Sequence, residues 1–401
     1  MSTKRISFEN RHGRELSGLL DLPDASDPHS YAIFAHCFIC SASVEAIESI
    51  SHALTTKGIA VLRFDFTGLD TGQIDNGEHH LSSNVFDLID AGNYLADAFQ
   101  APSILIGHSL GGAAAIFAAS QMKSVRAVAS IASPASNEGL MPLLERTGSP
   151  GEDGESVEIG GTRFVVSDEF MEDLDTYDMR SILESLNIPL LLLHSPEDRI
   201  VDIENAQKIY NWAHQPKSLI ALSGATHLLT DEADANYAGQ VIASWAARYL
   251  EIPRRETPET HHQVAVSLGN EGYTTEMVAG KHMLTADEPI NLGGKDYGPS
   301  PYEYVSAGLG ACTAMTLRMY ADRKKWDLQK VVVHLDHRKD YPSDIDETEK
   351  GREKIDIIDR RIEIYGDLDD KQKARLIEIA NKCPVHKTLR NVTTINTSLY
   401  N

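Results

Sequence analysis

Residues 103–112 read Ser-Ile-Leu-Ile-Gly-His-Ser-Leu-Gly-Gly, and this stretch decides the fold of the 401-residue chain. Its first half is an apolar run that predicts a buried strand, and the Ala-rich residues that follow predict a helix. The pattern Gly-x-Ser-x-Gly between them places Ser109 on a sharp turn, where the flanking glycines relieve crowding around an exposed hydroxyl. The helix that starts there points backbone N–H groups at developing negative charge. The stretch therefore predicts a nucleophilic serine, with a tight strand-to-helix turn as the structural alternative.

A base and an orienting acid must accompany this serine, because a serine hydroxyl alone is a poor nucleophile. Asp198 follows the apolar run 189–194, and His227 follows the apolar run 217–222 directly before a helical pattern. Both positions lie after expected strands, where an open α/β sheet has its ligand site. The order serine, acid, histidine is the order that this strand-turn-helix setting requires. Glu197 is the rival acid, while a helix cap for Asp198 and a surface loop for His227 are the structural alternatives.

The oxyanion formed during acyl transfer needs two N–H donors. The backbone of Leu110, directly after the serine, is expected to supply one of them. The other is expected from Phe38, with Cys37 as the alternative, in the loop after the apolar run 31–36. Cys37 and Cys40 form a C-x-x-C pair, but no further zinc ligands stand nearby and the setting of a thioredoxin-like motif is missing. They are best interpreted as two small packed thiols.

Short apolar runs alternate with helical patterns between residues 31 and 250. Continuous runs of this length are typical of strands that are buried on both faces of a parallel sheet, and most spacers are long enough for helical crossovers. The chain therefore has an α/β region, with strands expected at Tyr31–His36, Ala60–Phe66, Ser103–Gly107, Val125–Ala132, Pro189–His194 and Lys217–Leu222.

One spacer, residues 135–187, is too long for a simple crossover and is expected to be a small acidic cap. Residues 138–178 contain 12 acidic and 2 basic side chains. Within them, Val157–Val166 predicts a β-hairpin about Gly160 and Gly161, and Ser167-Asp168 predicts the start of a short helix. A disordered acidic loop is the alternative.

The net charge of −22 is unevenly distributed along the chain. Residues 1–252 hold 35 acidic and 15 basic side chains, while residues 253–401 hold 24 and 22. An acidic surface repels phosphate backbones, so nucleic acid is not an expected partner. The N-terminus lacks a signal-peptide pattern, no apolar run approaches the length of a membrane span, and four cysteines are too few for a disulfide framework. A cytoplasmic protein without cofactor or metal is expected.

A second domain is expected after a charged, proline-containing linker at residues 253–262, which would separate units 1–252 and 263–401. The pattern beyond the linker is α+β rather than a βαβ repeat. Strands are expected at Val264–Leu268, Tyr273–Ala279, Val331–His337, Ile357–Tyr365 and Val392–Leu399, and helices at Pro301–Arg323 and Asp369–Lys382.

Residues 1–252 resemble the α/β-hydrolase superfamily in three motifs, GHSLGG at 107–112, PEDRIV at 196–201 and GATH at 224–227. The resemblance implies a mostly parallel eight-stranded sheet and hydrolysis of a carboxylic ester or similar acyl bond in a small-molecule substrate. Relatives often have His-Gly after the first parallel strand, where this chain has His36-Cys37. The exact oxyanion donor therefore stays open.

Residues 263–401 resemble the OsmC/Ohr family in the stretches GPSPYE at 298–303, GAC at 310–312 and CPVHK at 383–387. The resemblance implies an intertwined homodimer and, in peroxidase members, a reactive Cys312 resolved by Cys383. A hydrolase followed by such a domain resembles the bifunctional α/β-hydrolase/OsmC fusion proteins.

The C-terminal domain departs from the peroxidase pattern at two places. Peroxidase members have a glutamate ten residues before the first cysteine, where this chain has Tyr302, with Glu303 one residue later. One residue turns about 100° around a helix, so Glu303 need not face the thiol. The members also have an arginine in the early strands, and residues 263–300 contain none. Three interpretations follow: an acyl hydrolase acting through Ser109, a thiol peroxidase, and a non-catalytic acyl-ligand scaffold.

Overall fold

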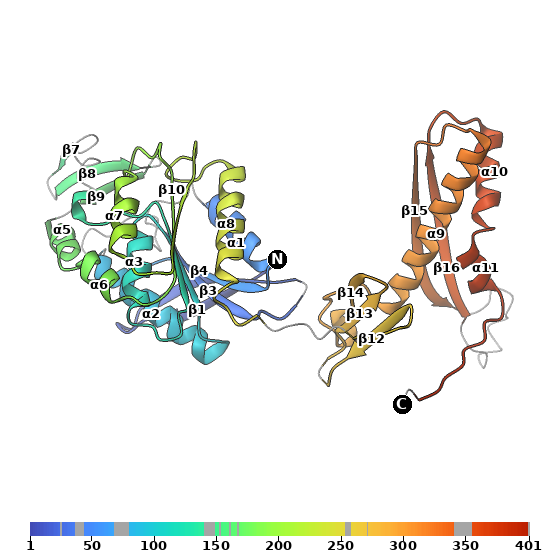
Figure 1. Ribbon diagram of the computed structural model, residues 1–401, viewed down its shortest axis with the longest axis horizontal. Helices are drawn as coiled ribbons and strands as arrows, with labels where there is room; N and C mark the ends of the chain where they lie inside the picture. Colours follow the sequence, from blue (N-terminus) through green and yellow to red (C-terminus); the bar gives the residue numbers. More distant parts are fainter. Residues whose placement is uncertain are drawn as a thin grey trace. The chain divides into compact units, whose positions relative to one another are not determined.

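The computed structural model has two compact units, Met1–Arg254 and Arg255–Asn401, which are described separately (Figure 1). The division into domains 1–252 and 263–401, joined by the linker 253–262, remains a prediction. The structure describes residues 1–24, 26–36, 44–67, 80–139, 149–151, 154–159, 162–166, 168–252, 258–270, 272–340 and 355–399.

The N-terminal unit is built on the predicted eight-stranded, mostly parallel sheet. Only β2 runs antiparallel to both of its neighbours. Every residue of the central strands β3, β4, β5, β6 and β10 is buried, which explains why they appear in the sequence as continuous apolar runs. In sheet order the strands are β1 (Ser2–Glu9), β2 (Glu15–Leu22), β4 (Ile59–Phe64), β3 (Ser30–Ala35), β5 (Ile104–His108), β6 (Ala127–Ile131), β10 (Leu190–His194) and β11 (Lys217–Ala221).

Two helical layers cover this sheet, one on each face (Figure 1). The helices α1 (Val44–Thr55) and α8 (Glu232–Ala246) share one hydrophobic cluster with it. The helices α2 (Leu81–Ala98), α3 (Leu110–Ala119), α6 (Met179–Ser185) and α7 (Glu204–Trp212) share the other. All ten residues of α3 are buried, so the helix that follows Ser109 lies deep in the unit.

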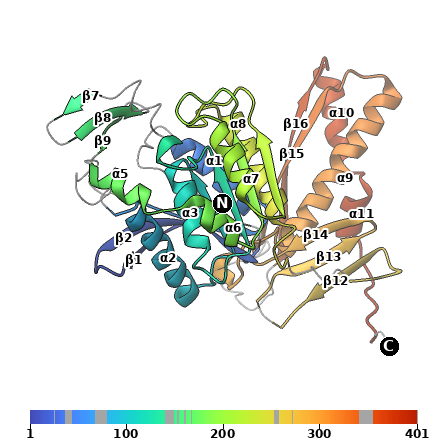
Figure 2. The same cartoon turned by 60° about the vertical axis from the view of Figure 1, so that its left-hand side comes forward.

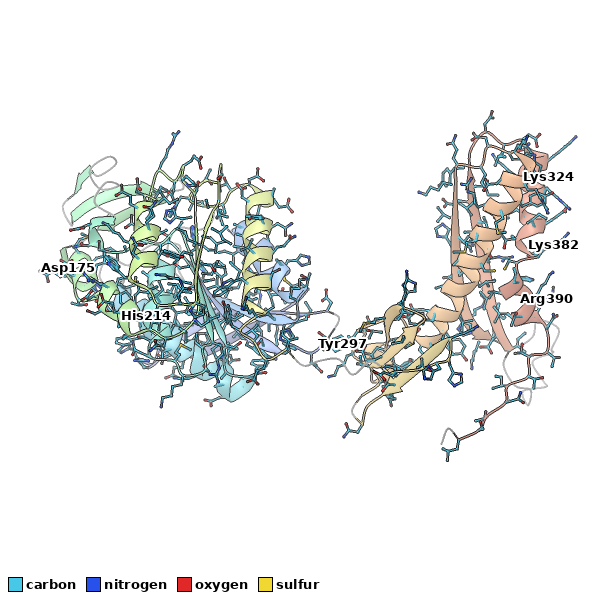
Figure 3. The ribbon with its side chains drawn as sticks, viewed as in Figure 1. Asp175, His214, Tyr297, Lys324, Lys382 and Arg390 are labelled. Atoms are coloured by element: carbon cyan, nitrogen blue, oxygen red, sulfur yellow. The ribbon has the colours of Figure 1, made fainter. Side chains whose placement is uncertain are left out.

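The insertion between β6 and β10 is folded in its described part. The strands β7 (Ser149–Gly151), β8 (Gly154–Ile159) and β9 (Thr162–Val166) form an antiparallel sheet, and α5 (Asp168–Asp175) follows. The pairing of β8 with β9 confirms the predicted hairpin, although its turn glycines and Ser167 lie outside the described residues. Asp175, labelled in Figure 3, is the last residue of α5. Asn137, in the short helix η1 (Asn137–Gly139), donates a hydrogen bond to it.

In its described part, the C-terminal unit contains two small sheets and three α-helices. Figure 2 shows these elements from a second side. The first sheet of the unit is antiparallel, and the second is a long hairpin against which α9 packs. The core between α9, α10 and the hairpin includes Leu317, Ala321, Leu376 and Ile379. The elements are β12 (Val264–Leu268), β13 (Thr275–Ala279), β14 (His282–Ala286), η2 (Ile290–Leu292), α9 (Pro301–Lys324), β15 (Lys330–Asp340), β16 (Ile355–Tyr365), α10 (Asp370–Ala380) and α11 (Pro384–Arg390).

One predicted strand of this unit is wrong. Residues 392–399 have no regular secondary structure, and Val392, Ile395 and Leu399 are 101%, 84% and 88% exposed. A strand needs a neighbouring strand for its backbone hydrogen bonds, and no pairing is found for this segment in the described parts of the chain. The strand β14 and the helix α11 were not predicted. No helix among the described residues has the length and apolar character that a membrane span requires.

Candidate active site

Ser109 lies on a strained turn between the last residue of β5 and the first residue of α3. Its φ of 56° and ψ of −127° are unusual for a residue with a side chain. Two hydrogen bonds hold this backbone, one from the Ser109 N–H to the Ile131 carbonyl at 2.8 Å and one from Ser133 Oγ to the Ser109 carbonyl at 2.8 Å. A Cβ at Gly111 would lie 2.4 Å from the Ala35 carbonyl oxygen, so only glycine allows this close approach.

The structure brings Ser109, His227 and Asp198 together, although 118 residues separate the serine from the histidine. His227 Nε2 lies 3.1 Å from Ser109 Oγ, and His227 Nδ1 lies 2.7 Å from Asp198 Oδ2. The side chains of His227 and Asp198 are 4% and 0% exposed. The other Asp198 oxygen, Oδ1, accepts hydrogen bonds from the N–H groups of Ile200 at 2.8 Å and Val201 at 3.0 Å. An ordered series of donors and acceptors therefore runs from the hydroxyl to the carboxylate.

Glu197, the rival acid, has different partners. Its Oε2 accepts hydrogen bonds from the Gly224 N–H at 3.0 Å and from Ser195 Oγ at 3.2 Å. These contacts fasten the acid loop to the loop before the histidine. Of the two adjacent carboxylates, Asp198 is the one within hydrogen-bond distance of the His227 ring.

The electrostatics of the site favour a neutral base beside a charged acid. Burial lowers the pKa of His227 below its usual range, against the opposing effect of the Asp198 carboxylate. Burial alone would raise the pKa of Asp198, but the hydrogen bond from His227 and the N–H groups of Ile200 and Val201 outweigh it, so this pKa is lowered. His227 is therefore free to accept a proton near neutral pH, and Asp198 stays ionised.

One of the two predicted oxyanion donors lies in the described part of the chain. The Leu110 N–H belongs to the first residue of α3, and the first N–H groups of a helix have no acceptor within it. Phe38, the alternative Cys37, and Cys40 lie outside the described residues. His36, directly after β3, places Nε2 3.6 Å from Oδ1 of Asp65, which directly follows β4.

Two polar residues beside the cluster of Ser109, His227 and Asp198 were not predicted. His108 and His194 are the last residues of β5 and β10, and both are buried. His108 directly precedes Ser109, and His194 lies four residues before Asp198. This closeness to a candidate residue is the only signal that the sequence offered.

The two cysteines predicted as a redox pair in the C-terminal unit lie on α9 and directly before α11. Cys312 on α9 and Cys383 before α11 are both free thiols. Thr313, the neighbour of Cys312, places Oγ1 3.7 Å from the buried Cys383 Sγ. Arg360 on β16, which was not predicted, donates from Nη1 to Thr313 Oγ1 at 2.8 Å. The Arg360 guanidinium therefore bonds the same Thr313 hydroxyl that contacts the Cys383 thiol. A cation is thus near this thiol, although the early strands contain no arginine.

Glu303 does not join this cluster. Its carboxylate accepts a hydrogen bond from the Ser300 N–H at 2.7 Å, as part of the capping box at the start of α9. This bond lowers the pKa of Glu303. At a rise of about 1.5 Å per residue, the nine residues to Cys312 span roughly 13 Å of helix. Tyr302, at the position of the peroxidase glutamate, stacks on His337 with ring centroids 4.2 Å apart.

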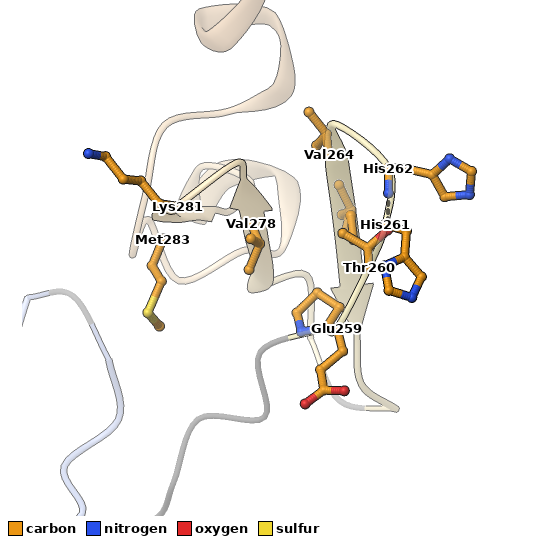
Figure 4. Close-up of a pocket in the computed structure, with 11 residues that line it drawn as sticks. Glu259, Thr260, His261, His262, Val264, Val278, Lys281 and Met283 are labelled. Carbon is orange, nitrogen blue, oxygen red and sulfur yellow. Dashed lines mark hydrogen bonds between the residues drawn. The ribbon is translucent and has the colours of Figure 1, made fainter.

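A groove of about 1010 Å³ opens on the first sheet of the C-terminal unit (Figure 4). Its lining includes Val264, Val266 and Met283, each more than half exposed, together with His261 and His262. Among the described residues of the whole chain, no three histidine, cysteine or acidic side chains gather in a way that could hold a metal ion.

Comparisons with known proteins match both units. A family model described as "Alpha/beta hydrolase family" matches residues 32–270, and one described as "OsmC-like protein" matches residues 293–398. The esterase domain of a Rhodothermus marinus protein is 41% identical, with a TM-score of 0.54, over 62% of this chain and 99% of that domain.

Two more distant similarities were also found. Est1E of Butyrivibrio proteoclasticus, solved with ferulic acid bound, is 18% identical with a TM-score of 0.50, over 61% of this chain and 98% of its own. The uncharacterized protein YfhR of Escherichia coli K12 is 21% identical over 232 residues, which are 57% of this chain and 74% of that protein.

Proposed function

Because the chain belongs to the alpha/beta hydrolase family and carries an OsmC-like domain after its hydrolase domain, we propose that it is a serine esterase with the triad Ser109, His227 and Asp198. The hydrogen-bonded series from Ser109 Oγ through the His227 ring to Asp198 carries this proposal. The 41% identity to the Rhodothermus marinus esterase domain favours a carboxylic ester as the bond that is cleaved.

Acylation begins with proton transfer from Ser109 to His227. As Oγ attacks the ester carbonyl carbon, His227 Nε2 takes the hydroxyl proton across the 3.1 Å contact. Asp198 stabilises the imidazolium that forms and keeps Nδ1 protonated, so that Nε2 is the free acceptor. The imidazolium then gives its proton to the departing alkoxide, which leaves as the alcohol, and Ser109 becomes acylated.

The tetrahedral intermediate needs donors for its negative oxygen. We assign the Leu110 N–H to this role, and the Phe38 N–H as the second donor, with Cys37 as the alternative. Deacylation repeats the sequence with water: His227 takes a water proton, the hydroxide attacks the acyl carbon, and the proton returns to Ser109 as the acid is released. No cofactor is required at any step.

The insertion between β6 and β10 is assigned as an acidic cap over the site. Residues 138–178 hold ten more acidic than basic side chains. A rim of negative charge repels anionic substrates over about one Debye length, roughly 10 Å at 0.1 M salt. The proposed substrate class is therefore a neutral ester with a short or medium acyl chain.

Hydrolysis of p-nitrophenyl butyrate tests the proposal. Ser109→Ala should lower kcat by several orders of magnitude, because the nucleophile and the base act as a unit. Ser120→Ala is the matched control: this serine caps the end of α3, is exposed, and its hydroxyl donates to the Phe117 carbonyl of its own helix. Turnover by the Ser109 variant within tenfold of wild type would contradict the triad, and a loss in the Ser120 variant would indicate damage to α3.

For the C-terminal unit we propose a homodimer contact. Its described core is small, and many apolar side chains are open to solvent. The tail 392–399 has no strand partner in the described parts of its own chain, and the face of the first sheet that includes Val264, Val266 and Leu284 is largely exposed. Met315 and Met319 on α9 are also exposed. Pairing with a second copy would bury these surfaces and give the tail a strand neighbour.

A thiol peroxidase is the second candidate function, favoured by the contact of Arg360 with Thr313. The Cys312 thiolate would attack a hydroperoxide oxygen, giving a sulfenic acid and an alcohol; Cys383 would then form the disulfide and release water, and an external dithiol would restore both thiols. Consumption of cumene hydroperoxide with dithiothreitol, lost in Cys312→Ser but not in Ser109→Ala, would support this function. If the wild-type protein consumes cumene hydroperoxide no faster than dithiothreitol alone, the peroxidase function is excluded and the cysteines have a structural role.

A further inference from the structure

Two buried histidines outside the proposed triad occupy equivalent places in the sheet. His108 ends β5 and directly precedes Ser109, while His194 ends β10 and lies four residues before Asp198. They are 5% and 0% exposed. The proposed chemical steps use neither side chain, so their burial beside the reacting groups needs a separate explanation.

His108 connects the nucleophile turn to the backbone of the base. Its Nε2 lies 2.7 Å from the carbonyl oxygen of His227, 119 residues later in the chain. A carbonyl oxygen can only accept, so the hydrogen of this bond belongs to His108 Nε2. The two imidazole rings lie with their centroids 5.0 Å apart. Since His108 and Ser109 are adjacent, this bond directly links the nucleophile to the loop that carries His227.

His194 makes the equivalent connection for the acid. Its Nε2 lies 2.8 Å from the Val201 carbonyl oxygen and 3.5 Å from Asp198 Oδ2. The N–H groups of Val201 and Ile200 are the two donors to Asp198 Oδ1, so the bond from His194 fixes the turn that orients the carboxylate. Its Nδ1 is buried and has no hydrogen-bond partner among the described residues, so the bond through Nε2 is the one that orients the ring.

We infer that His108 and His194 are positioning residues of the site: each acts as an Nε2–H donor that holds the backbone of a loop carrying a triad member. This inference rests on the proposed esterase function. Displacement of a reacting group by about 1 Å can cost roughly 10²-fold in rate, so the two bonds have a large effect on turnover.

Paired substitutions separate positioning from packing. In His108→Gln the amide nitrogen reaches the place of Nε2 and keeps the donor, whereas in His108→Leu the volume remains and the donor is lost. The same pair applies to His194. His214→Leu is the matched control, because this exposed histidine makes the same kind of bond, Nε2 to the Glu184 carbonyl at 2.7 Å, away from the triad.

The measurement is kcat and KM for p-nitrophenyl butyrate, normalised to active sites that react with a fluorophosphonate. We expect His108→Leu and His194→Leu to lower kcat about 10- to 100-fold with KM within twofold. The glutamine variants should recover to within about fivefold of wild type, and His214→Leu should match wild type. If a leucine variant does not fold, His108→Asn replaces it, because its shorter amide cannot reach the His227 carbonyl; His194→Asn serves in the same way.

Two results would overturn the inference: leucine variants with unchanged kcat per active site, or glutamine variants no better than leucine or asparagine variants. Failure of the esterase proposal gives a different pattern, because wild type would then show no turnover that depends on Ser109. The wild-type and Ser109→Ala measurements therefore separate the two failures.

Discussion

Asp198→Asn tests the orientation of the proposed base. The Asp198 Oδ1 accepts two backbone N–H groups, at 2.8 and 3.0 Å, and Oδ2 faces His227 Nδ1 at 2.7 Å. In the variant, the amide oxygen keeps the two N–H donors, so its NH₂ group faces Nδ1. Nδ1 must then accept, and the ring hydrogen moves to Nε2. Nε2 then directs its own hydrogen at Ser109 Oγ, so it cannot accept the serine proton.

The size of the effect follows from the alternative amide orientation. Turning the amide round would leave two buried N–H groups unsatisfied, at about 1–3 kcal/mol each. If this cost totals about 2 kcal/mol, roughly one molecule in thirty has the productive tautomer, in which the ring hydrogen is on Nδ1; a larger cost makes that fraction smaller. Loss of the negative charge that stabilises the imidazolium adds to this, and the total expected for a triad is about 10⁴-fold in kcat, or about 5.5 kcal/mol.

Steady-state hydrolysis of p-nitrophenyl butyrate at pH 8 measures this loss. Glu197→Gln is the matched control, because its carboxylate bonds the Gly224 N–H and Ser195 instead of the histidine. We expect that variant to keep kcat within about tenfold of wild type. A loss of less than tenfold in Asp198→Asn, or a larger loss in Glu197→Gln, would refute the assignment of the acid.

Three further predictions concern pH, charge and assembly. Because the pKa of His227 is lowered and only the neutral ring accepts a proton, kcat/KM should fall as pH drops through a midpoint below 6.5; a pH profile with a midpoint above 6.5 would contradict this. At low salt, kcat/KM for the neutral ester p-nitrophenyl butyrate should exceed kcat/KM for the anionic ester mono-p-nitrophenyl succinate several-fold, and this difference should narrow in 0.5 M salt. Equal values at low salt would argue against the acidic cap. Light scattering of the full chain should give twice the mass of one chain, and a single-chain mass at micromolar concentration would remove the dimer proposal.

The sequence predicted the centre of the hydrolase sheet well because its strands are buried on both faces. Five of the six apolar runs correspond to the buried strands β3, β4, β5, β6 and β10, and the sixth corresponds to the edge strand β11, whose residues are only partly buried or exposed. The hairpin of β1 and β2 was not predicted, because most of its residues are polar and few are buried. In β1 only Ile6 and Phe8 are buried. A half-exposed edge strand therefore gives a weaker signal than a central one.

The site was predictable to the extent that its chemistry is local in sequence. Ser109 is identified by its own turn, and Asp198 and His227 follow from strand ends. The contacts that organise them are not local: His108 reaches the His227 carbonyl across 119 residues. In the same way Arg360 reaches Thr313 from a strand 47 residues later, so a search of the early strands for a cation could not find it. The strand expected at 392–399 is wrong for a related reason, since pairing depends on a neighbour that local pattern cannot supply.

Fluorophosphonate labelling followed by peptide mass spectrometry tests whether Ser109 is the nucleophile. The reagent forms a stable adduct only with a serine that is activated by a neighbouring base. We expect one adduct per chain, on the peptide that contains Ser109, and loss of both the adduct and ester hydrolysis in Ser109→Ala. An adduct on a different serine, or ester hydrolysis that continues when Ser109 is fully labelled, would contradict this expectation.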